Sequence, residues 1–353
     1  MKIFVPGRTE IIGNHTDHQQ GRVIASAVEI GITAQCSRTS DGTAHVRSDG
    51  RRPMHVDLSN LEPVERERGT TLALVRGVAC ALKKRGYKVG GFRAESRSAI
   101  RSGGGLSSSA AFCVLIGRIF SWLYNGGEVD AITLARCAQE AENIHFGKPS
   151  GLMDQLACAI GKAVYIDFAE DEIVALDCNF GAMGLTLCLT DTGGSHANLT
   201  ADYAAIRSDM NAVAASYGKD VLRYVNYNEF LEKGSAESAA RLRAEHFFEE
   251  NERVPLMREA MEKGDAEACL RLMNASGRSS EEKLRNIRCD AGDDRLEKGI
   301  ELSAKLLAGK GAWRVHGGGF AGCVQALVPT GFFGEYKKSM DASFGLNACF
   351  KIM

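Results

Sequence analysis

The amino-acid sequence predicts an α+β fold in two domains, and three observations lead to it. The chain has 353 residues, enough for one large or two moderate hydrophobic cores, and two domains are the default expectation. In the N-terminal half, segments of strand-like periodicity are interleaved with segments of helical periodicity. From residue 199 to about 307, nearly everything is helical and rich in charge. We therefore place the domain boundary near residue 180, which gives domains at 1–180 and 181–353.

The spacing of apolar residues predicts each element in turn. In the N-terminal half it predicts strands at KIFV (2–5), VIASAVEIGITAQC (23–36) and FRAESR (92–97), with Phe92, Ala94 and Ser96 on one face of the last. Helices are predicted at 71–84, 107–124 and 131–145. The second helix should turn one apolar side inward, made of Ala111, Val114, Leu115, Ile119, Trp122 and Leu123. Later strands are predicted at AVYID (163–167), LTLCLTD (185–191), AWRV (312–315), GCVQALV (322–328) and NACFKI (347–352).

Composition argues against several classes of function. Lys and Arg number 43 against 44 Asp and Glu, so the formal net charge of -1 gives no global attraction to nucleic acid or to an anionic membrane. We therefore expect a small-molecule partner. The 11 cysteines are scattered without a CxxC pair or a secretory signal, which predicts reduced, buried thiols, a cytoplasmic protein and no structural zinc site. No apolar run approaches the roughly 18 residues that a membrane span requires.

A glycine-rich segment, SGGGLSSSA (102–110), stands between a predicted strand and a predicted helix, an order typical of phosphate-binding sites. Glycines let the backbone approach an anion, and serines add hydroxyls where the first helical N–H groups and the helix dipole favour negative charge. The residues concerned are Gly103, Gly104, Gly105, Ser107, Ser108 and Ser109. The segment is neither a Walker A loop nor GxGxxG. Taken alone, it also fits a plain glycine turn capped by serine.

The segment PGRTEIIGNHTDHQQG (6–21) is dense in short polar side chains: Arg8, Asn14, His15, Asp17 and His18. A sugar needs directional donors and acceptors on several hydroxyls, and Asn, His and Asp supply both kinds. A solvated surface loop is the alternative interpretation of this segment alone. A metal site is less favoured, because the spacing matches no zinc pattern.

Two carboxylates flank one bend in AENIHFGKPSGLMDQ (141–155). Glu142 ends one predicted helix and fits a Mg²⁺ ligand, whereas Asp154 begins the next and could face a nucleophilic hydroxyl. If Ser150 caps the second helix, the helix dipole and a nearby Arg8 would both lower the pKa of Asp154. Asp154 would then orient the hydroxyl and accept its proton late in a loose transition state. Without the other segments, two surface carboxylates at helix ends would be the better interpretation.

A second glycine run, RVHGGGFAGC (314–323), joins two predicted C-terminal strands. Three consecutive glycines indicate that the backbone approaches something closely, either a ligand or another loop. We predict that this segment helps to close the active site.

Together these segments resemble the galactokinase family, within the galacto-, homoserine-, mevalonate- and phosphomevalonate-kinase (GHMP) superfamily. Residues 6–21 are similar to the galactokinase signature PGRVNLIGEHTDYNGG, residues 102–110 to the superfamily phosphate loop, and GKPSGLMDQ (147–155) to the stretch with the catalytic aspartate. Later segments that are similar to galactokinases include DTGGSHANLTADYAAIR, HFFEENERV, LMNASGRSS and WRVHGGGFAGC. The resemblance covers nearly the whole chain.

The resemblance implies ATP- and Mg²⁺-dependent phosphorylation of the C1 hydroxyl of galactose. It implies that Asp154 is the catalytic aspartate, that Arg8 is paired with it, and that Ser109 and Glu142 hold Mg²⁺. It implies a sugar pocket lined by Asn14, His15, Asp17, Gly151 and Tyr203. It implies that the nucleotide phosphates bind Gly103, Gly104, Gly105, Leu106, Ser107, Ser108 and Ser109. The implied fold has an N-terminal domain like domain 2 of ribosomal protein S5 and a ferredoxin-like C-terminal domain with helical insertions, with the active site in the cleft between them.

The sequence departs from the family pattern at several positions. Asn14 stands where the family has Glu, His18 replaces a Tyr, and Asn143 replaces a His. A kinase for a related sugar such as N-acetylgalactosamine therefore stays open, as does a galactokinase-like sensor without turnover. The sensor predicts a damaged catalytic set, whereas Arg8, Glu142 and Asp154 are present. We expect a monomer, with a dimer left open.

Overall fold

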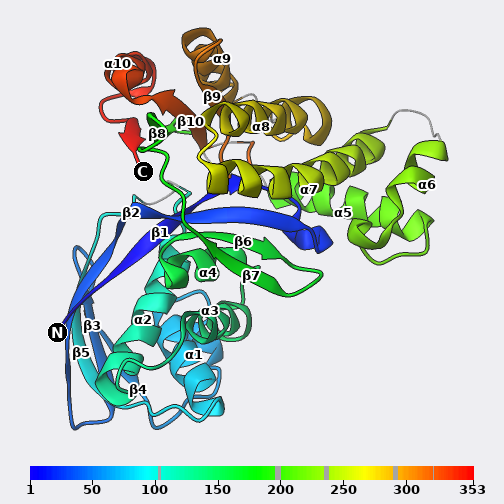
Figure 1. Ribbon diagram of the computed structural model, residues 1–353. Helices are drawn as coiled ribbons and strands as arrows, with labels where there is room; N and C mark the ends of the chain where they lie inside the picture. The colour runs from blue at the N-terminus through cyan, green and yellow to red at the C-terminus, as the bar shows by residue number, and fades with distance from the viewer. Residues whose placement is uncertain (102–104, 195–199, 234–237, 289–292, 321) are drawn as a thin grey trace. The chain divides into compact units, whose positions relative to one another are not determined.

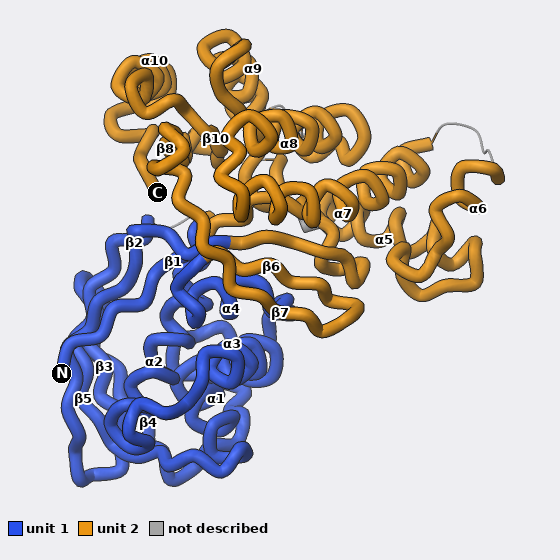
Figure 2. The backbone as a smooth tube through the Cα atoms, in the orientation of Figure 1, with its two compact units in different colours: residues 1–8, 26–102, 106–162 blue, residues 9–25, 103–105, 163–353 orange. Residues whose placement is uncertain are grey.

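In the computed structural model, which describes residues 1–101, 105–194, 200–233, 238–288, 293–320 and 322–353, the chain forms two compact units (Figures 1 and 2). Unit 1 comprises residues 1–8, 26–102 and 106–162, and unit 2 comprises residues 9–25, 103–105 and 163–353. Two long strands, β1 (Lys2–Ile12) and β2 (Arg22–Arg38), contribute residues to both units. Hence these units are not consecutive stretches of sequence, and the single boundary near residue 180 stays a prediction.

The sheet of unit 1 has the strand order β4-β3-β5-β2, with β1 beside β2. It contains β3 (Thr43–Ser48), β4 (Met54–Asp57) and β5 (Phe92–Ser98), and β3 and β5 are parallel. On β5 the side chains alternate as predicted, because Phe92, Ala94 and Ser96 are buried and the residues between them are exposed. One face of the sheet is therefore closed to solvent by packed helices.

Those helices gather on one face of the sheet in Figure 1. They are α1 (Thr71–Lys84), α2 (Ser108–Tyr124), α3 (Ala131–Glu140) and α4 (Met153–Ile160), with a short 3₁₀ turn at Glu65–Glu67 before α1. The predicted helix at 71–84 is confirmed at both ends. The predicted helix at 131–145 changes at Ala141 from α-helix to a π-helical turn, Ala141–Phe146. This π-turn positions one of the site residues described below.

The buried side of α2 was predicted correctly except near its end. Ala111, Val114, Leu115 and Ile119 are fully buried, but Trp122 is 54% exposed, so its predicted place in the core is wrong. Trp122 lies in the last helical turn, where its ring packs against the backbone of Gly127 instead of the sheet. Helical spacing alone does not show where a helix runs past the core that it covers.

Unit 2 contains a four-stranded antiparallel sheet in the order β11-β8-β10-β9. Its strands are β8 (Leu185–Asp191), β9 (Ala312–Val315), β10 (Cys323–Pro329) and β11 (Cys349–Lys351), as the sequence predicted. With α9 (Arg295–Leu307) before β9 and α10 (Phe333–Phe344) between β10 and β11, the order is β-α-β-β-α-β. This is the ferredoxin-like arrangement that was expected.

The other elements of unit 2 are mostly helical, as the charge-rich region predicted. Between β8 and α9 the described residues form the helices α5 (Thr200–Ser216), α6 (Tyr227–Glu232), α7 (Ala239–Lys263) and α8 (Ala266–Ser279). Short helical turns occur at Asp17–Gln19, Leu222–Tyr224, Ser280–Leu284 and Thr330–Phe332. β6 (Ala163–Asp167) and β7 (Glu172–Leu176) form an antiparallel hairpin.

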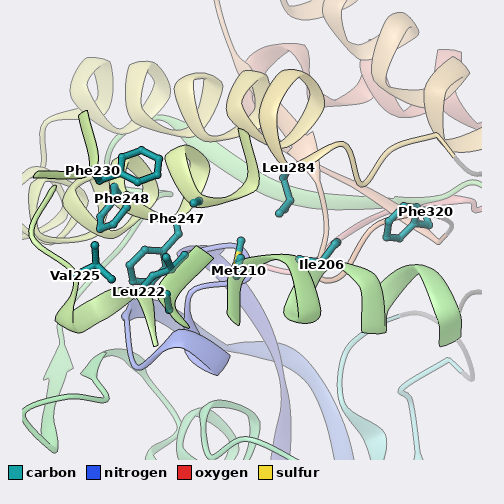
Figure 3. Close-up of a cluster of buried hydrophobic side chains, with 11 residues drawn as sticks. Ile206, Met210, Leu222, Val225, Phe230, Phe247, Phe248, Leu284 and Phe320 are labelled. Carbon is teal, nitrogen blue, oxygen red and sulfur yellow. The ribbon is translucent and has the colours of Figure 1, made fainter. Parts of the chain in front are cut away.

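A cluster of buried apolar side chains joins α5, α6 and α7 (Figure 3). Ile206 and Met210 come from α5, Phe230 from α6, and Phe247 and Phe248 from α7. The ring centroids of Phe230 and Phe248 lie 5.0 Å apart, within the range of favourable aromatic pairs. This cluster fixes α7, which in turn supports the polar loop that follows β1.

The ten described cysteines are free; nine are buried and Cys178 is partly exposed. Cys289 lies outside the described residues. Within the described part of the chain, none of the helices is long and apolar enough to cross a membrane.

Candidate active site

The predicted site residues fall into two groups, one in each unit. In unit 1, Arg8 on β1 and Asp154 in the first turn of α4 form a two-pronged ion pair. Arg8 Nε donates to Asp154 Oδ1 at 2.6 Å, and a terminal nitrogen donates to Oδ2 at 2.9 Å. Ser107 Oγ also donates to Oδ2. This fork geometry fixes the plane of the carboxylate, which remains 27% exposed.

The pKa of Asp154 is lowered from its usual value. Burial by itself raises this pKa, but the charge of Arg8 and the hydrogen bonds from Arg8 and Ser107 outweigh burial. The downward direction and the contribution of Arg8 were predicted, but the helix cap that the prediction assumed at Ser150 is wrong. Ser150 does not cap α4, because its hydroxyl donates to the carbonyl of Lys148, and the helix begins after Leu152 without a side-chain cap.

Ser107 has an unusual backbone conformation. Its φ of 53° and ψ of 55° are left-handed, which is uncommon for a residue other than glycine. As the residue before α2, Ser107 could cap that helix, yet its side chain makes no cap hydrogen bond and donates to Asp154 instead. Strained residues of this kind occur frequently at functional sites.

Glu142 and Ser109, the two predicted Mg²⁺ ligands, lie in contact. Ser109 Oγ donates to Glu142 Oε1, and Gln155 Nε2 donates to Oε2. Glu142 is 2% exposed and belongs to the π-turn, a local geometry often found at functional sites. A hydroxyl and a carboxylate are hard oxygen donors of the kind that Mg²⁺ prefers, so these residues fit that ion.

The phosphate segment is only partly described. Ser102, Gly103 and Gly104 lie outside the described residues. Gly105 has a φ of 69°, a conformation that favours glycine. Leu106 is buried, and its carbonyl accepts from the backbone N–H of Arg8 at 3.2 Å. Ser108 is exposed at the start of α2.

Sequence reasoning could not place a pocket for the base of a nucleotide. Unit 1 contains a cavity of about 340 Å³ that borders the phosphate segment through Ser108 and Ser109. Its walls are mixed: Leu74, Phe112 and Phe146 are apolar, whereas Asp49 and Arg51 bring charge. No motif marks this cavity, because its lining comes from strands, helices and loops far apart in the sequence.

In unit 2, the polar loop after β1 contains Asn14, His15 and Asp17. His15 and Asp17 are half-buried, and Asn14 is only 1% exposed. The side chain of Asn14 is hydrogen-bonded on all sides by protein groups, so the structure does not leave it open to a ligand. Tyr203 on α5 is half-buried and donates to the carbonyl of Gly319 at 2.8 Å. Gly151, in unit 1, is exposed between the π-turn and α4.

A chain of hydrogen bonds fixes the tautomers of two histidines in this loop. Gln19 Nε2 donates to His18 Nδ1 at 3.3 Å, so the proton of neutral His18 is on Nε2, which lies 3.3 Å from His15 Nδ1. His15 must then donate from Nε2 to the carbonyl of Gly318, at 3.1 Å. Burial, followed by the charge of His15, lowers the pKa of His18 to about 3, which keeps it neutral at pH 7. The departure at His18 therefore has a structural role.

Two residues of α7 support the loop, and sequence reasoning missed both. Glu250 Oε1 accepts from the backbone N–H groups of Gly13 and Asn14, at 3.0 and 3.1 Å. His246 Nε2 donates to the carbonyl of Asn14 at 2.9 Å. Both side chains are fully buried and four residues apart, on one face of the helix. In the sequence, these two residues could have been recognised as a His and a Glu that are four residues apart among the apolar positions of a predicted helix.

Family models and curated relatives match this chain over most of its length. The family described as GHMP kinases N terminal domain matches residues 73–162, and the Galactokinase galactose-binding signature matches residues 2–38. A galactokinase from Thermotoga petrophila is 32% identical over 358 residues, which cover 98% of this chain and 94% of the relative. A galactokinase from Streptomyces coelicolor is 30% identical over 347 residues, covering 96% and 87%.

Solved structures show the same fold. A Lactococcus lactis galactokinase complexed with galactose has a TM-score of 0.83 at 24% identity, covering 97% of this chain and 89% of the other. A Methanococcus jannaschii mevalonate kinase has a TM-score of 0.72 at 16% identity, covering 100% and 98%. The predicted two-domain GHMP kinase fold is confirmed by these similarities.

Proposed function

Because this chain belongs to the galactokinase family, we propose that it transfers the γ-phosphoryl group of ATP to the C1 hydroxyl of galactose, giving galactose 1-phosphate and ADP. The observation that supports this most strongly is the carboxylate of Asp154, held by Arg8 and Ser107 at the end of the phosphate segment. Phosphoryl transfer depends mainly on positioning and electrostatics, and this group offers both.

The lowered pKa of Asp154 decides how it acts. An ionised carboxylate with a low pKa is a weak base in the ground state. It can hold the C1 hydroxyl by accepting its hydrogen bond, and it can take the proton late, when the bond from the γ-phosphorus to its leaving oxygen is largely broken. Arg8 holds the carboxylate in place and supplies positive charge near the transferring group.

For the sugar we propose Asp17 and Tyr203 of unit 2 as contacts. His15 and Gly151 stay predictions from the resemblance, and in this structure both ring nitrogens of His15 are engaged, by His18 and by the carbonyl of Gly318. Asp17 supplies a carboxylate acceptor, and Tyr203 supplies a hydroxyl that can accept as well as donate. Asn14 was expected to be a further sugar contact, and its role is argued separately below.

For the nucleotide we propose that the base occupies the cavity of unit 1, with its phosphates toward Ser108 and Ser109. The apolar walls at Leu74, Phe112 and Phe146 suit a planar aromatic base. Ser109 and Glu142 would hold Mg²⁺, which supplies charge neutralisation to the phosphate oxygens when bound. The remaining phosphate contacts, Gly103 to Ser107, stay as predicted from the resemblance.

Glutamine in place of Glu142 tests the metal assignment. We expect the Mg²⁺ concentration for half-maximal activity to rise on the order of 10-fold, since a charged ligand becomes a neutral one. Titration of Mg²⁺ at fixed ATP measures it. Glu140→Gln is the matched control, because Glu140 lies two residues earlier and pairs with Lys84 and Arg85. Equal Mg²⁺ curves for the two variants would contradict the assignment.

The function itself is tested by ADP release from ATP and Mg²⁺ with galactose, glucose, N-acetylgalactosamine, 2-deoxygalactose, arabinose and mevalonate. We expect galactose turnover with the phosphate on C1, located by NMR. Turnover only on another sugar would move the function within the family. Saturable sugar binding without ADP release would favour a sensor. A cytoplasmic location stays a prediction, as does a monomeric state.

A further inference from the structure

Three successive carbonyls of the second glycine run accept hydrogen bonds from residues predicted to bind the sugar. We name Gly317–Gly319 the glycine segment. Asn14 Nδ2 donates to the carbonyl of Gly317 at 2.6 Å, His15 Nε2 lies 3.1 Å from that of Gly318, and Tyr203 Oη donates to that of Gly319 at 2.8 Å. The segment is thus held at every residue, by the loop after β1 at Gly317 and Gly318 and by α5 at Gly319.

The amide of Asn14 has no hydrogen-bonding capacity left. Its nitrogen donates to Glu10 Oε1 at 3.2 Å as well as to Gly317. Its oxygen accepts from Asn286 Nδ2 at 2.9 Å and from Ser280 Oγ at 3.3 Å. An amide offers two donor hydrogens and two lone pairs, and all four are used. Contact with a sugar would require breaking one of these bonds at a side chain that is 1% exposed.

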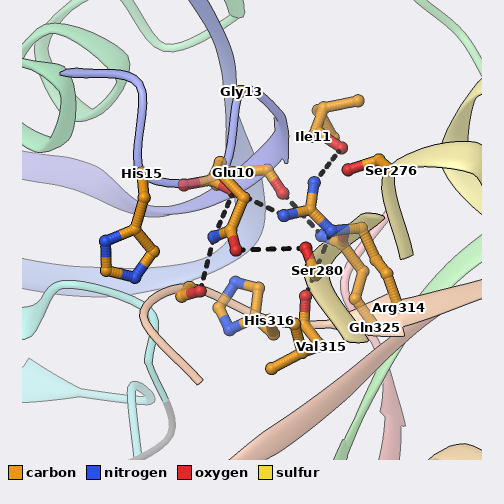
Figure 4. A network of polar contacts seen from close by, with 12 residues as sticks. Glu10, Ile11, Gly13, His15, Ser276, Ser280, Arg314, Val315, His316 and Gln325 are labelled. Carbon is orange, nitrogen blue, oxygen red and sulfur yellow. Dashed lines mark hydrogen bonds and ion pairs between the residues drawn. The ribbon is translucent and has the colours of Figure 1, made fainter. Parts of the chain in front are cut away.

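Glu10 provides the counter-charge of this network (Figure 4). Its Oε1 accepts from a terminal nitrogen of Arg314 at 2.7 Å and from Asn14. The side chain of Arg314 is fully buried and also donates to the carbonyls of Ile11 and Val315. A buried guanidinium requires such a carboxylate, because burial of an unpaired charge is costly.

Glu10 and Asn14 are exchanged relative to the galactokinase signature. The signature PGRVNLIGEHTDYNGG has Asn at the position of Glu10 and Glu at the position of Asn14. This chain keeps one amide and one carboxylate, hydrogen-bonded to each other, but in the reverse order. The identities of the two residues therefore depend on each other. Exchange of Glu10 alone would leave two amides beside Arg314, and exchange of Asn14 alone would leave two carboxylates there.

We propose that Asn14 is a positioning residue that holds the glycine segment for sugar binding. In this chain Glu10 supplies the carboxylate of the Glu10–Asn14 pair, and this carboxylate is the partner of Arg314. This inference rests on the proposed function. Sugar recognition is then left to the other predicted contacts. The glycines support it, because a Cβ on Gly318 would lie 2.5 Å from the ring of Tyr203, and one on Gly319 would collide with the carbonyl of Asn286.

Deoxy sugars distinguish a positioning residue from a sugar ligand. In Asn14→Ala we expect kcat/KM for galactose and for its 2-, 3-, 4- and 6-deoxy forms to fall by one common factor, on the order of 10-fold for lost hydrogen bonds. If Asn14 instead bound one sugar hydroxyl directly, the deoxy sugar that lacks this hydroxyl would show no further loss of kcat/KM in Asn14→Ala. Asn228→Ala, an exposed asparagine on α6, is the control. Selective loss would overturn the proposal.

Hydrogen exchange of the glycine segment tests the same proposal without catalysis. Backbone amides at 317–319 should exchange at least several-fold faster in Asn14→Ala than in the wild type or Asn228→Ala, in the absence of any sugar. Unchanged exchange would contradict positioning by Asn14. If the wild type phosphorylates no sugar, the proposed function fails, but this measurement still decides whether Asn14 holds the segment.

The double exchange tests the pairing of Glu10 with Asn14. Asn14→Glu alone places two carboxylates side by side, and Glu10→Asn alone leaves Arg314 unpaired, so both should lose sugar kcat/KM and thermal stability. Glu10→Asn with Asn14→Glu restores the order of the signature and should recover at least 10-fold in kcat/KM over the worse single variant. A double variant that is no better than this single variant would overturn the exchange.

Discussion

Replacement of Asp154 by alanine is expected to lower kcat by at least about 10²-fold, the low end for a positioned proton acceptor. The change removes the group that accepts the proton of the sugar hydroxyl and leaves Arg8 without its two-pronged partner. Steady-state ADP release at saturating ATP and galactose measures it. ATP binding should survive, because neither Arg8 nor Asp154 lines the cavity that we propose for the nucleotide base.

Two further variants separate chemistry from folding. Asp154→Asn keeps the size of the side chain and should lose a similar factor, because an amide cannot take up the proton. Asp130→Ala removes the side chain that caps α3 through the N–H of Thr133, and it should cost about 1 kcal/mol of stability with kcat unchanged. Near-normal turnover in Asp154→Ala would contradict the assignment of Asp154 as the catalytic residue.

Local patterns were sufficient to predict most elements of the fold. Helix α1 and the strands of the ferredoxin-like sheet follow from apolar periodicity, which reports which side of an element is buried. Trp122 was placed wrongly because periodicity does not report where a neighbouring layer ends. Likewise, the position of Ser150 shortly before α4 suggested a helix cap, but in the structure its hydroxyl donates to the carbonyl of Lys148.

The candidate site was predicted only in part, because its residues are far apart in the sequence and local patterns do not show which of them meet. Arg8 and Asp154 are 146 positions apart, so no local pattern links them, and their pairing was predicted from the resemblance. Asn14 was predicted to contact the sugar because short polar side chains suit a hydroxyl-rich ligand and because the resemblance places it in the sugar pocket. Its four partners come from positions 10, 280, 286 and 317, and no local pattern could show that they surround it.

The second large effect is expected at Glu250 of α7, which supports the polar loop after β1. Glu250 accepts from Gly13, Asn14 and Ser276 through one oxygen and from Arg253 through the other. Alanine at this position would leave two buried N–H groups and the Nε of Arg253 without their acceptor. We expect a loss of about 3 kcal/mol in the free energy of unfolding.

Denaturant unfolding at pH 7 measures this loss, with Glu249→Ala as the matched control on the same helix. Glu249 is 34% exposed and pairs with Lys283 and Arg253, so its removal should cost less than about 1 kcal/mol. Equal losses for the two variants would contradict a special role for Glu250. A raised KM for galactose in Glu250→Ala, with KM for ATP unchanged, would further locate the effect in the polar loop after β1.

The difference between wild type and Glu250→Ala should also depend on pH, in a direction that the pKa determines. Burial by itself raises the pKa of Glu250, but the charge of Arg253 and other favourable contacts lower it well below its usual range. The stabilisation is therefore complete above the unfolded-state pKa of about 4.3 and is lost as the pH falls below it. We expect a constant difference from pH 5 to 8 that narrows below about pH 4. A difference that stays constant to pH 3 would show that Glu250 acts through packing and not through its charge.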